Sequence, residues 1–284
     1  MNKTGVREQG SENRKRKSGL ANRWVVAACM CAGMALQAKA FAAGPDARAI
    51  MENVYRQDMA QDIAMRASFQ IFDRQGQSTK KEFNLKRVGA PGDSKTLVVF
   101  TAPQEIRGVA LLSINQKGAN EKQYMYIPAQ QRTRSVATQE RTTRFLGTDF
   151  TFEDIGERVL DDFNYKLLGD AEVIDGKKTY KIEATPVDPS RSQYKYVYYW
   201  VAQDVPVIVF AEFYDAQGQK VRVLHATDIK RENGVWGARN TEMATVEDGT
   251  RTVLHIDEVK FNAKPDETLF TPDGLAGALG PEKK

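Results

Sequence analysis

The sequence predicts a mainly β protein: a half-open antiparallel β-barrel or strongly curved sheet of about eleven to thirteen strands, with a helix and a loop as its lid. Segments rich in β-branched and aromatic residues occur in pairs around short glycine-containing turns, the pattern of β-hairpins. Several segments are apolar on both faces, so both faces of the sheet need cover. One amphipathic helix precedes them and is expected to supply part of it.

Each element is expected at a definite place along the chain. A helix is expected over residues 45–60, with Asp46 as its N-cap and apolar residues at three- and four-residue spacing. Three hairpins turn at Gly76, Gly218 and Gly249. The expected strands are 63–73, 78–88, 95–101, 109–115, 123–127, 132–136, 165–174, 178–185, 193–201, 207–214, 220–230, 235–246 and 251–261.

The chain has 284 residues, 41% hydrophobic and 27% charged, which is enough to bury a core and too polar for many membrane spans. Its net charge of +4 belongs to the N-terminal segment, since residues 1–42 hold eight basic and two acidic residues and the remainder has a net charge of −2. Nucleic-acid binding therefore loses its main support.

Residues 1–42 have the composition of a cleaved secretory signal peptide. A basic stretch that ends at Arg23 precedes the uncharged run 24–36, which is too short to span a bilayer of about 30 Å. Small residues follow, and they predict cleavage after Ala40 or Ala42. An uncleaved anchor is the alternative.

Both cysteines, Cys29 and Cys31, lie inside this segment. Lipidation of Cys29 is the weaker interpretation. Only two apolar residues lie between Arg23, the last charged residue, and the lipoprotein-type motif of residues 26–29. The remaining chain, residues 43–284, is expected to form one domain without a disulfide, a thiol nucleophile or a cysteine metal site.

Charge is unevenly distributed along the strands. Residues 63–145 carry 14 basic and 6 acidic side chains, whereas residues 146–284 carry 17 and 25. The first set predicts a docking surface for anionic lipid headgroups or an acidic partner, and ordinary solvated strand faces are the alternative.

Motifs for catalysis, metals or cofactors are not found. His225 and His255 each lie in a strand pattern without a second ligand at metal spacing. The acidic pairs 153–154 and 161–162 are adjacent only in sequence, which does not make a catalytic pair. The aromatic run 194–200 indicates a strand with aromatics on both faces rather than a sugar-stacking platform. The chain is therefore expected to be no enzyme, without a metal or cofactor.

The segment 124–160 is the most informative part of the chain. A strand, a turn at Pro128 and a second strand lead through a basic connection into RFLGTDFTFEDI, residues 144–155. As a loop over a barrel mouth it would place its aromatic side chains inside, with Asp149 or Thr151 capping a short helix that begins near Phe152. A loop that simply plugs the core is the alternative.

That segment resembles the LolA-like family of outer-membrane lipoprotein-sorting proteins. Other blocks are similar in the same order, namely FTAPQEIRGVALLSI, YYWVAQDVPVIVFAEFYDAQGQKV, NGVW and LHIDEVKFNAKPDETLFTPDGL. The similarity extends over about Ala49–Leu275. It implies an incomplete antiparallel barrel around a helix-and-loop lid that encloses an apolar cavity.

The resemblance implies a periplasmic carrier for the acyl chains of a lipid or lipoprotein, accompanied by an inner-membrane exporter of the RND type and an outer-membrane acceptor. The protein is expected to work as a monomer. The expected cavity or lid residues are Ile50, Val54, Tyr55, Phe145, Phe150, Phe152 and Ile155. The expected headgroup or docking residues are Arg107, Arg132, Arg134 and Arg144.

Two alternatives stay open at this point. The same architecture resembles periplasmic stress sensors, which bind lipid and regulate a membrane partner without transport. A lipid hydrolase that uses carboxylates, with Asp149 as the test residue, is the third hypothesis.

Overall fold

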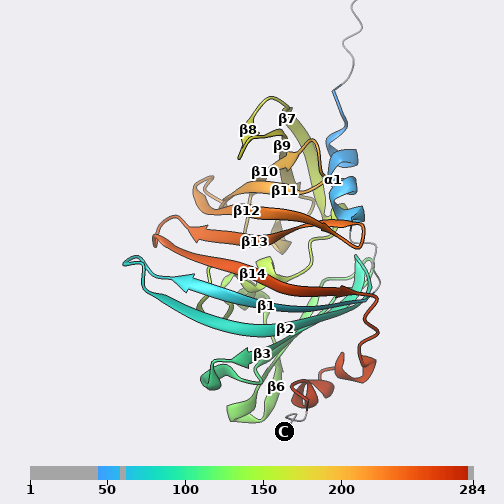
Figure 1. Cartoon of the computed structure of the whole chain (residues 1–284), viewed down its shortest axis with the longest axis vertical. Helices are drawn as coiled ribbons and strands as arrows, with labels where there is room; N and C mark the ends of the chain where they lie inside the picture. The colour runs from blue at the N-terminus through green and yellow to red at the C-terminus, as the bar shows by residue number, and fades with distance from the viewer. Residues whose placement is uncertain (1–43, 58–61, 281–284) are drawn as a thin grey trace, which may run out of the picture. The chain divides into compact units, whose positions relative to one another are not determined.

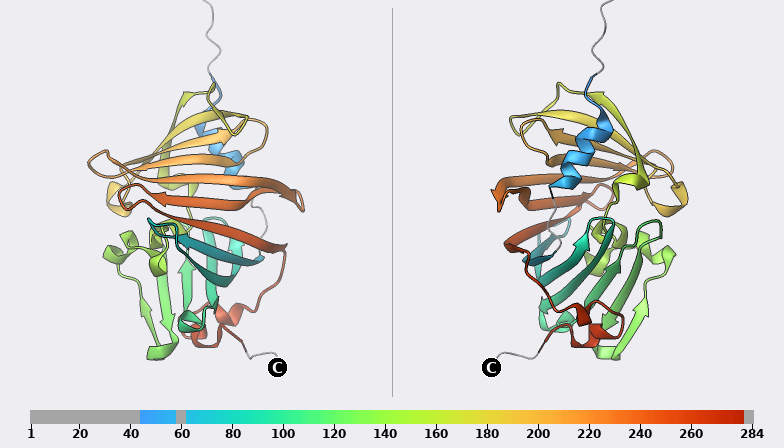
Figure 2. Two further views of the ribbon diagram at one scale, coloured as in Figure 1. Left: turned by 60° about the vertical axis from the view of Figure 1, so that its left-hand side comes forward. Right: turned by 90° about the vertical axis from the view of Figure 1, so that its right-hand side faces the viewer.

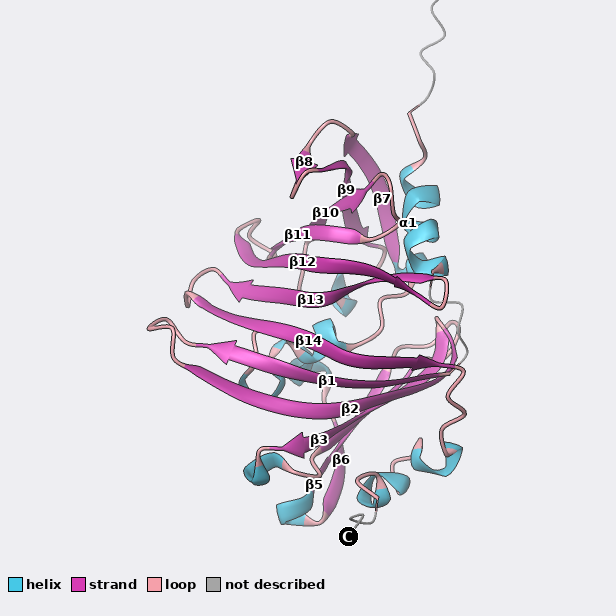
Figure 3. Ribbon diagram, viewed as in Figure 1, coloured by secondary structure: helices cyan, strands magenta, loops and turns pink. Residues whose placement is uncertain are grey.

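The computed structural model describes residues 44–57 and 62–280 of the chain. The expected signal peptide, its cleavage sites and both cysteines lie outside these residues. In the described part the backbone forms a fourteen-stranded antiparallel sheet, two α helices and several 3-10 helices (Figures 1 and 3). The helices are α1 (Ala47–Arg56) and α2 (Phe152–Ile155). Neither they nor any other described helix has the length and apolar character needed to cross a bilayer.

Most strands begin and end within a few residues of the expected positions, because glycine turns separate them. In chain order they are β1 (Ile63–Phe72), β2 (Ser78–Ala90), β3 (Asp93–Ala102), β4 (Ala110–Ile114), β5 (Lys122–Ile127), β6 (Arg132–Ser135), β7 (Phe163–Gly169), β8 (Val173–Ile174), β9 (Lys177–Pro186), β10 (Tyr196–Ala202), β11 (Ile208–Tyr214), β12 (Lys220–Glu232), β13 (Val235–Thr245) and β14 (Thr250–Phe261).

The strand count is higher than expected because the expected strand 165–174 is two strands. β7 ends at Gly169, and β8 pairs with β9 through a tight turn at Asp175 and Gly176. Both turn residues have positive φ angles, 48° and 77°, as a two-residue hairpin loop requires.

The sheet is open, as the sequence predicts. Its order is β6-β5-β4-β3-β2-β1-β14-β13-β12-β11-β10-β9-β7, and the edge strands β6 and β7 do not pair with each other. Register shifts within five of the strand pairs add local bends to a sheet of this length. Figure 2 shows the strands curving around α1 and the segment that follows β6.

The main core lies on the concave side of the sheet. Phe69, Phe83 and Phe100 extend inward from the adjacent strands β1, β2 and β3, with ring centroids 4.8 and 5.6 Å apart along the row. α1 covers part of this side: Asp46 caps it by accepting a hydrogen bond from the Arg48 amide at 3.2 Å, and Met51 is fully buried.

The convex side is covered as well. The segment after β14 packs Phe270 and Leu275 against Leu97 and Leu112 of β3 and β4. A separate outer cluster surrounds Trp200 of β10. The expectation that both faces of the sheet need cover is therefore confirmed.

The uneven charge of the sequence places a basic excess in one half of the sheet. Strands β1 to β6 come from residues 63–135 and form one half of the sheet, and β7 to β14 come from residues 163–261 and form the other. Residues 63–135 carry a net charge of +7, so the half that contains β6 is basic. Residues 163–261 carry a net charge of only −2, and most of the acidic excess lies in residues 146–162, which have a net charge of −5.

Phe270→Ala is expected to lower the free energy of unfolding by about 3–5 kcal/mol, because it removes a side chain that is only 1% exposed from the cover of β3 and β4. Chemical denaturation measures this. Val246→Ala, at a position that is 49% exposed, is the control and should change stability by less than about 0.5 kcal/mol. Equal effects would contradict a structural role for the C-terminal cover.

Candidate functional site

The segment between β6 and β7, residues 136–162, fills the concavity of the sheet, and we call it the plug. Phe145, Phe150 and Phe152 are 0, 5 and 6% exposed. The ring of Phe145 lies 5.7 Å from that of Phe100 and 5.3 Å from that of Phe152, and Phe150 lies 5.6 Å from Phe69. The plug thus extends the aromatic row of the sheet into the interior of the barrel.

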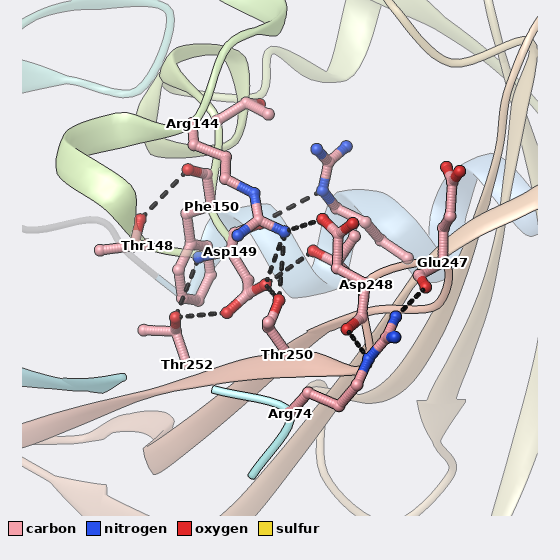
Figure 4. Close-up of polar contacts among 12 residues, drawn as sticks. Arg74, Arg144, Thr148, Asp149, Phe150, Glu247, Asp248, Thr250 and Thr252 are labelled. Atoms are coloured by element: carbon pink, nitrogen blue, oxygen red, sulfur yellow. Dashed lines mark hydrogen bonds and ion pairs between the residues drawn. The ribbon is translucent and has the colours of Figure 1, made fainter. Parts of the chain in front are cut away.

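A buried carboxylate holds the plug in place (Figure 4). Asp149 is fully buried, and its carboxylate accepts hydrogen bonds from Thr245 at 2.7 Å, from Thr252 at 2.7 Å and from Thr250. These threonines belong to β13 and β14. Arg144 Nη2 lies 3.4 Å from Asp149 and also bonds Asp248. We call Asp149, its three threonines and Arg144 the Asp149 latch.

The backbone of Asp149 is bound too. Its amide donates to Thr252 Oγ1 at 2.9 Å, and its carbonyl oxygen accepts from Arg222 Nε at 3.2 Å. On the other side of the plug, Lys81 of β2 donates to the carbonyl oxygen of Leu146. The plug is therefore attached to both halves of the sheet.

Helix α2 begins where the sequence predicts, and of the two expected caps Thr151 is the one used. Thr151 Oγ1 accepts from the Asp154 amide at 3.2 Å, and Asp154 accepts from the Thr151 amide at 2.9 Å. Tyr194 also donates to Asp154 at 2.9 Å. Burial and the Asp154 carboxylate raise the pKa of Tyr194, so this hydroxyl stays a donor.

A cavity of about 760 Å³, which we call the polar cavity, lies beside α1 and the end of the plug. The β2–β3 and β4–β5 turns and residues 186–192 complete its wall. Its lining is rich in charged side chains: Glu52, Arg56, Asp93, Lys117, Glu121, Arg141, Glu153, Glu157, Arg158, Asp161, Asp162, Asp188 and Arg191.

A second cavity of about 220 Å³, which we call the inner groove, lies along β1, β12, β13 and β14. Most of its lining is apolar: Ile63, Met65, Val235, Trp236, Ala238, Ile256, Val259 and Phe261, with Gly237 among them. α1 lines the polar cavity through Glu52, Tyr55 and Arg56, and Gln57, which follows α1, accepts a hydrogen bond at 3.3 Å from the amide of Trp236 in β13.

Glu121 is the most perturbed acid of the polar cavity. Its side chain is 6% exposed, Arg141 donates to it at 2.7 Å, and the Glu157 amide lies 3.4 Å away. Burial raises the pKa of Glu121 to about 7, against the opposing effect of Arg141. Gly156 allows this approach, because a Cβ atom there would lie 2.6 Å from Glu121 Oε2.

The expected lid residues are mostly core residues in the structure. Ile50, Val54 and Ile155 pack on the concave core, as do the three plug phenylalanines, and of all seven expected residues only Tyr55 lines either cavity. The plug has its aromatics inside, as both interpretations of the segment require. A direct contact of these residues with lipid stays a prediction.

The four expected arginines do not share one role. Arg144 belongs to the latch, and Arg134 of β6 pairs with Glu140 at 2.7 Å. Arg107 donates to the carbonyl oxygen of Thr101 at 3.1 Å, and Arg132 is exposed on the edge strand β6. Headgroup or partner binding by these arginines also stays a prediction.

Both histidines have polar partners within the sheet. His225 contacts Asp175 at 2.5 Å, and His255 contacts Asn240 at 2.6 Å. Among residues 44–57 and 62–280 no group of three or more His, Cys, Asp or Glu side chains is placed to hold a metal ion. The aromatic run divides between the two faces, with Tyr199 in the concave core and Trp200 in the outer cluster.

Comparison with solved structures identifies the class of protein. A domain of an outer membrane lipoprotein-sorting protein from Vibrio parahaemolyticus is 23% identical, with a TM-score of 0.76 over 81% of this chain and 98% of that one. A DUF1329 family protein from Desulfovibrio piger is 22% identical, with a TM-score of 0.77 over 81% and 97%. A LolA superfamily protein from Nitrosomonas europaea is 20% identical, with a TM-score of 0.64 over 81% and 99%.

The chain thus has the open-barrel fold of the LolA superfamily, and the LolA-like resemblance noted in the sequence is confirmed. A family model with the description "-like: Uncharacterized protein" matches residues 92–276, and the chain belongs to that family. None of the curated protein sequences compared with the chain matches it.

Asp149→Asn is expected to lower the free energy of unfolding by about 2–4 kcal/mol, because an amide places N–H groups against threonine hydroxyls that donate. Thermal and urea denaturation measure this. Asp248→Asn, at a 53% exposed carboxylate that binds the same Arg144, should change stability by less than about 0.5 kcal/mol. If the two variants are equally stable, the latch does not hold the plug.

Stability should fall as the pH rises from about 4.5 to 7, because over that window folded Glu121 keeps a proton that unfolded Glu121 has lost. The loss is on the order of 3 kcal/mol. Urea denaturation at several pH values measures it, and Glu121→Gln should remove this part of the slope. Glu140→Gln is the control. Glu140 is exposed, and hydrogen bonds from the Ala137 amide and from Arg134 lower its pKa, so it does not contribute to the slope between pH 4.5 and 7. A slope unchanged by Glu121→Gln would contradict the assignment.

Proposed function

We propose that the protein is a periplasmic carrier, which binds the apolar part of a lipid or lipoprotein inside its half-open barrel and passes it between the inner and outer membranes. The inner groove supports this most directly. It is an unfilled apolar space on the concave face of the sheet, walled by side chains such as Met65, Val259 and Phe261. Each methylene group that such a wall keeps from water is worth about 0.8 kcal/mol.

The two covers of the concavity are attached with different strength. The plug is bound by the Asp149 latch and by Lys81. α1 has only two fully buried side chains, Ala47 and Met51, and its polar attachments are Arg48 to Asp161 and Gln57 to Trp236. The inner groove is smaller than the 300–1,000 Å³ of typical ligand sites, so a long acyl chain needs more room. We therefore assign the opening movement to α1 and treat the plug as the fixed floor.

The proposed route runs between an inner-membrane exporter of the RND type and an outer-membrane acceptor. The net positive charge of strands β1 to β6 supports docking to an acidic partner or to anionic headgroups. The signal-like composition of residues 1–42 supports the periplasmic location. No cofactor is needed for such exchange.

A periplasmic lipid-sensing adaptor is the second candidate, favoured by the same basic half of the sheet. A membrane protein captured in a salt-sensitive complex, without lipid transfer to acceptor vesicles, would support the adaptor. The hydrolase hypothesis lacks support at Asp149, because three threonines and Arg144 already occupy its carboxylate.

Gly237→Trp is expected to lower retention of lipid after detergent-free purification by at least about tenfold, because Gly237 lines the inner groove and its Cβ direction is open. Denaturing mass spectrometry of the extracted lipid measures this. Gly169→Trp is the matched control, since Gly169 also has open space around its Cβ position and lines neither cavity. Equal lipid content in both variants would contradict binding in the inner groove.

A further inference from the structure

Arg158 is an enclosed cation without a bonded carboxylate. Its side chain is 21% exposed, and its Nη1 donates to the hydroxyl of Tyr199 at 2.9 Å. The closest carboxylate oxygen is that of Asp154, 3.9 Å from Nη2, and this nitrogen is buried without a hydrogen-bond partner. Buried charges are ordinarily paired and hydrogen-bonded, so an arginine in this state calls for a further partner.

Aromatic rings hold the guanidinium group in position. Its Cζ atom lies 5.5 Å from the ring centroid of Phe163, 5.9 Å from that of Tyr194 and 5.4 Å from that of Phe213. Burial acts to lower the pKa of Arg158, but Tyr199 and Asp154 outweigh it and raise the pKa, so the group stays charged. The cation is therefore fixed by π faces and a phenol, which leave its Nη2 group without a hydrogen-bond acceptor.

Asp154 attracts Arg158 without a hydrogen bond to it, because its oxygens bond other donors. Its carboxylate accepts from the hydroxyl of Tyr194 at 2.9 Å and from the amide and the hydroxyl of Thr151 at 2.9 and 2.8 Å. These contacts fix the start of α2. Asp154 therefore lies 3.9 Å from Arg158 and leaves the buried Nη2 of Arg158 without an acceptor.

Three further carboxylates of the polar cavity accept hydrogen bonds in a similar way. Glu157 accepts from the Gly92 amide at 2.5 Å, from Ser94 and from Asn115 at 3.3 Å. Glu153 accepts from the Gln193 amide at 2.9 Å and from Ser192 at 2.5 Å. Asp162 accepts from Arg191 at 3.2 and 3.3 Å.

Two guanidinium groups of the cavity have N–H groups without a partner. Besides Nη2 of Arg158, the buried Nε of Arg141 has none, although Arg141 donates to Glu121 through Nη2. Two guanidinium groups with free N–H positions match the oxygens of a carboxylate or a phosphate. Apolar side chains share the same wall: Tyr55, Val159, Leu160 and Phe163.

We propose that the polar cavity binds the anionic head, a carboxylate or phosphate group, of an amphiphile, with Arg158 as the main contact and Arg141 as the second. The inference rests on the proposed carrier function and names the chemical class of its cargo. Since α1 lines the polar cavity and the residue that follows it is bonded to β13 beside the inner groove, a head at Arg158 would direct the apolar chain along α1 toward that groove.

Two ligands that share one hydrocarbon chain test the proposed head site. Oleate carries a carboxylate, and oleyl alcohol carries no charge. Binding to delipidated full-length protein is measured by displacement of a fluorescent fatty-acid analogue. Wild-type protein should bind oleate at least tenfold more tightly than oleyl alcohol. Arg158→Gln should reduce this ratio to about one and leave oleyl alcohol binding unchanged, and Arg141→Gln should reduce the ratio partly.

Arg56→Gln is the matched control, because Arg56 also lines the polar cavity but is bonded to Glu52 at 2.6 Å. It should leave the ratio unchanged. The ratio of the two affinities within one variant does not depend on its folded fraction, because both ligands are measured on the same sample. A partly unfolded Arg158→Gln sample therefore still reports on binding of the head group. If the Arg158→Gln and Arg141→Gln proteins both keep the wild-type preference for oleate over oleyl alcohol, the assignment is wrong.

The remaining outcomes separate this inference from the carrier function. Equal affinity of wild-type protein for both ligands would overturn the head site and leave the carrier standing. Binding of neither ligand would overturn the carrier function and the inference with it. Inorganic phosphate is the third probe: if it binds Arg158 as tightly as oleate does, the site is one for free anions and the amphiphile assignment is wrong.

Discussion

The carboxylate of Asp149 is the interaction on which the interior of this barrel depends. A half-open sheet has a concave face that must be filled, and here a chain segment fills it instead of a second sheet. Three threonine hydroxyls and Arg144 satisfy the buried charge, which would otherwise make the position unfavourable. With Asp149 fixed, Phe145 and Phe150 are held on either side of it in the aromatic core.

Two elements fill the concavity, the strongly attached plug and the more weakly attached α1. Two different cavities remain beside them. The plug is bonded to both halves of the sheet, so it behaves as part of the scaffold. α1 lies over part of the remaining concave surface and lines the polar cavity, and Gln57, which follows it, is bonded to β13 beside the inner groove. An opening at α1 would therefore join charged and apolar walls into one site without disturbing the core.

Local chemistry explains what could be predicted from the sequence. Glycine turns and alternating residues define the hairpins, and Asp46 and Thr151 cap helices within their own segments. The Asp-Gly turn at Asp175 was an available signal for the β8–β9 hairpin, but the strand 165–174 was expected to run through to it. The open barrel was predictable because strands that are apolar on both faces require cover on both sides of the sheet.

The candidate site was less predictable because its partners are remote in sequence. Asp149 is recognisable as part of an unusual loop, but its threonines lie about a hundred residues further on and meet it only after β13 and β14 form. Glu121 and Arg158 look like ordinary solvated charges in the sequence, and only the packing of the plug encloses them. This enclosure leaves Arg158 with Asp154 at 3.9 Å and no hydrogen-bonded carboxylate, because the packing of the plug bonds Asp154 to Thr151 and Tyr194 instead. Under the proposed function, the anionic head of the cargo would supply the missing acceptor.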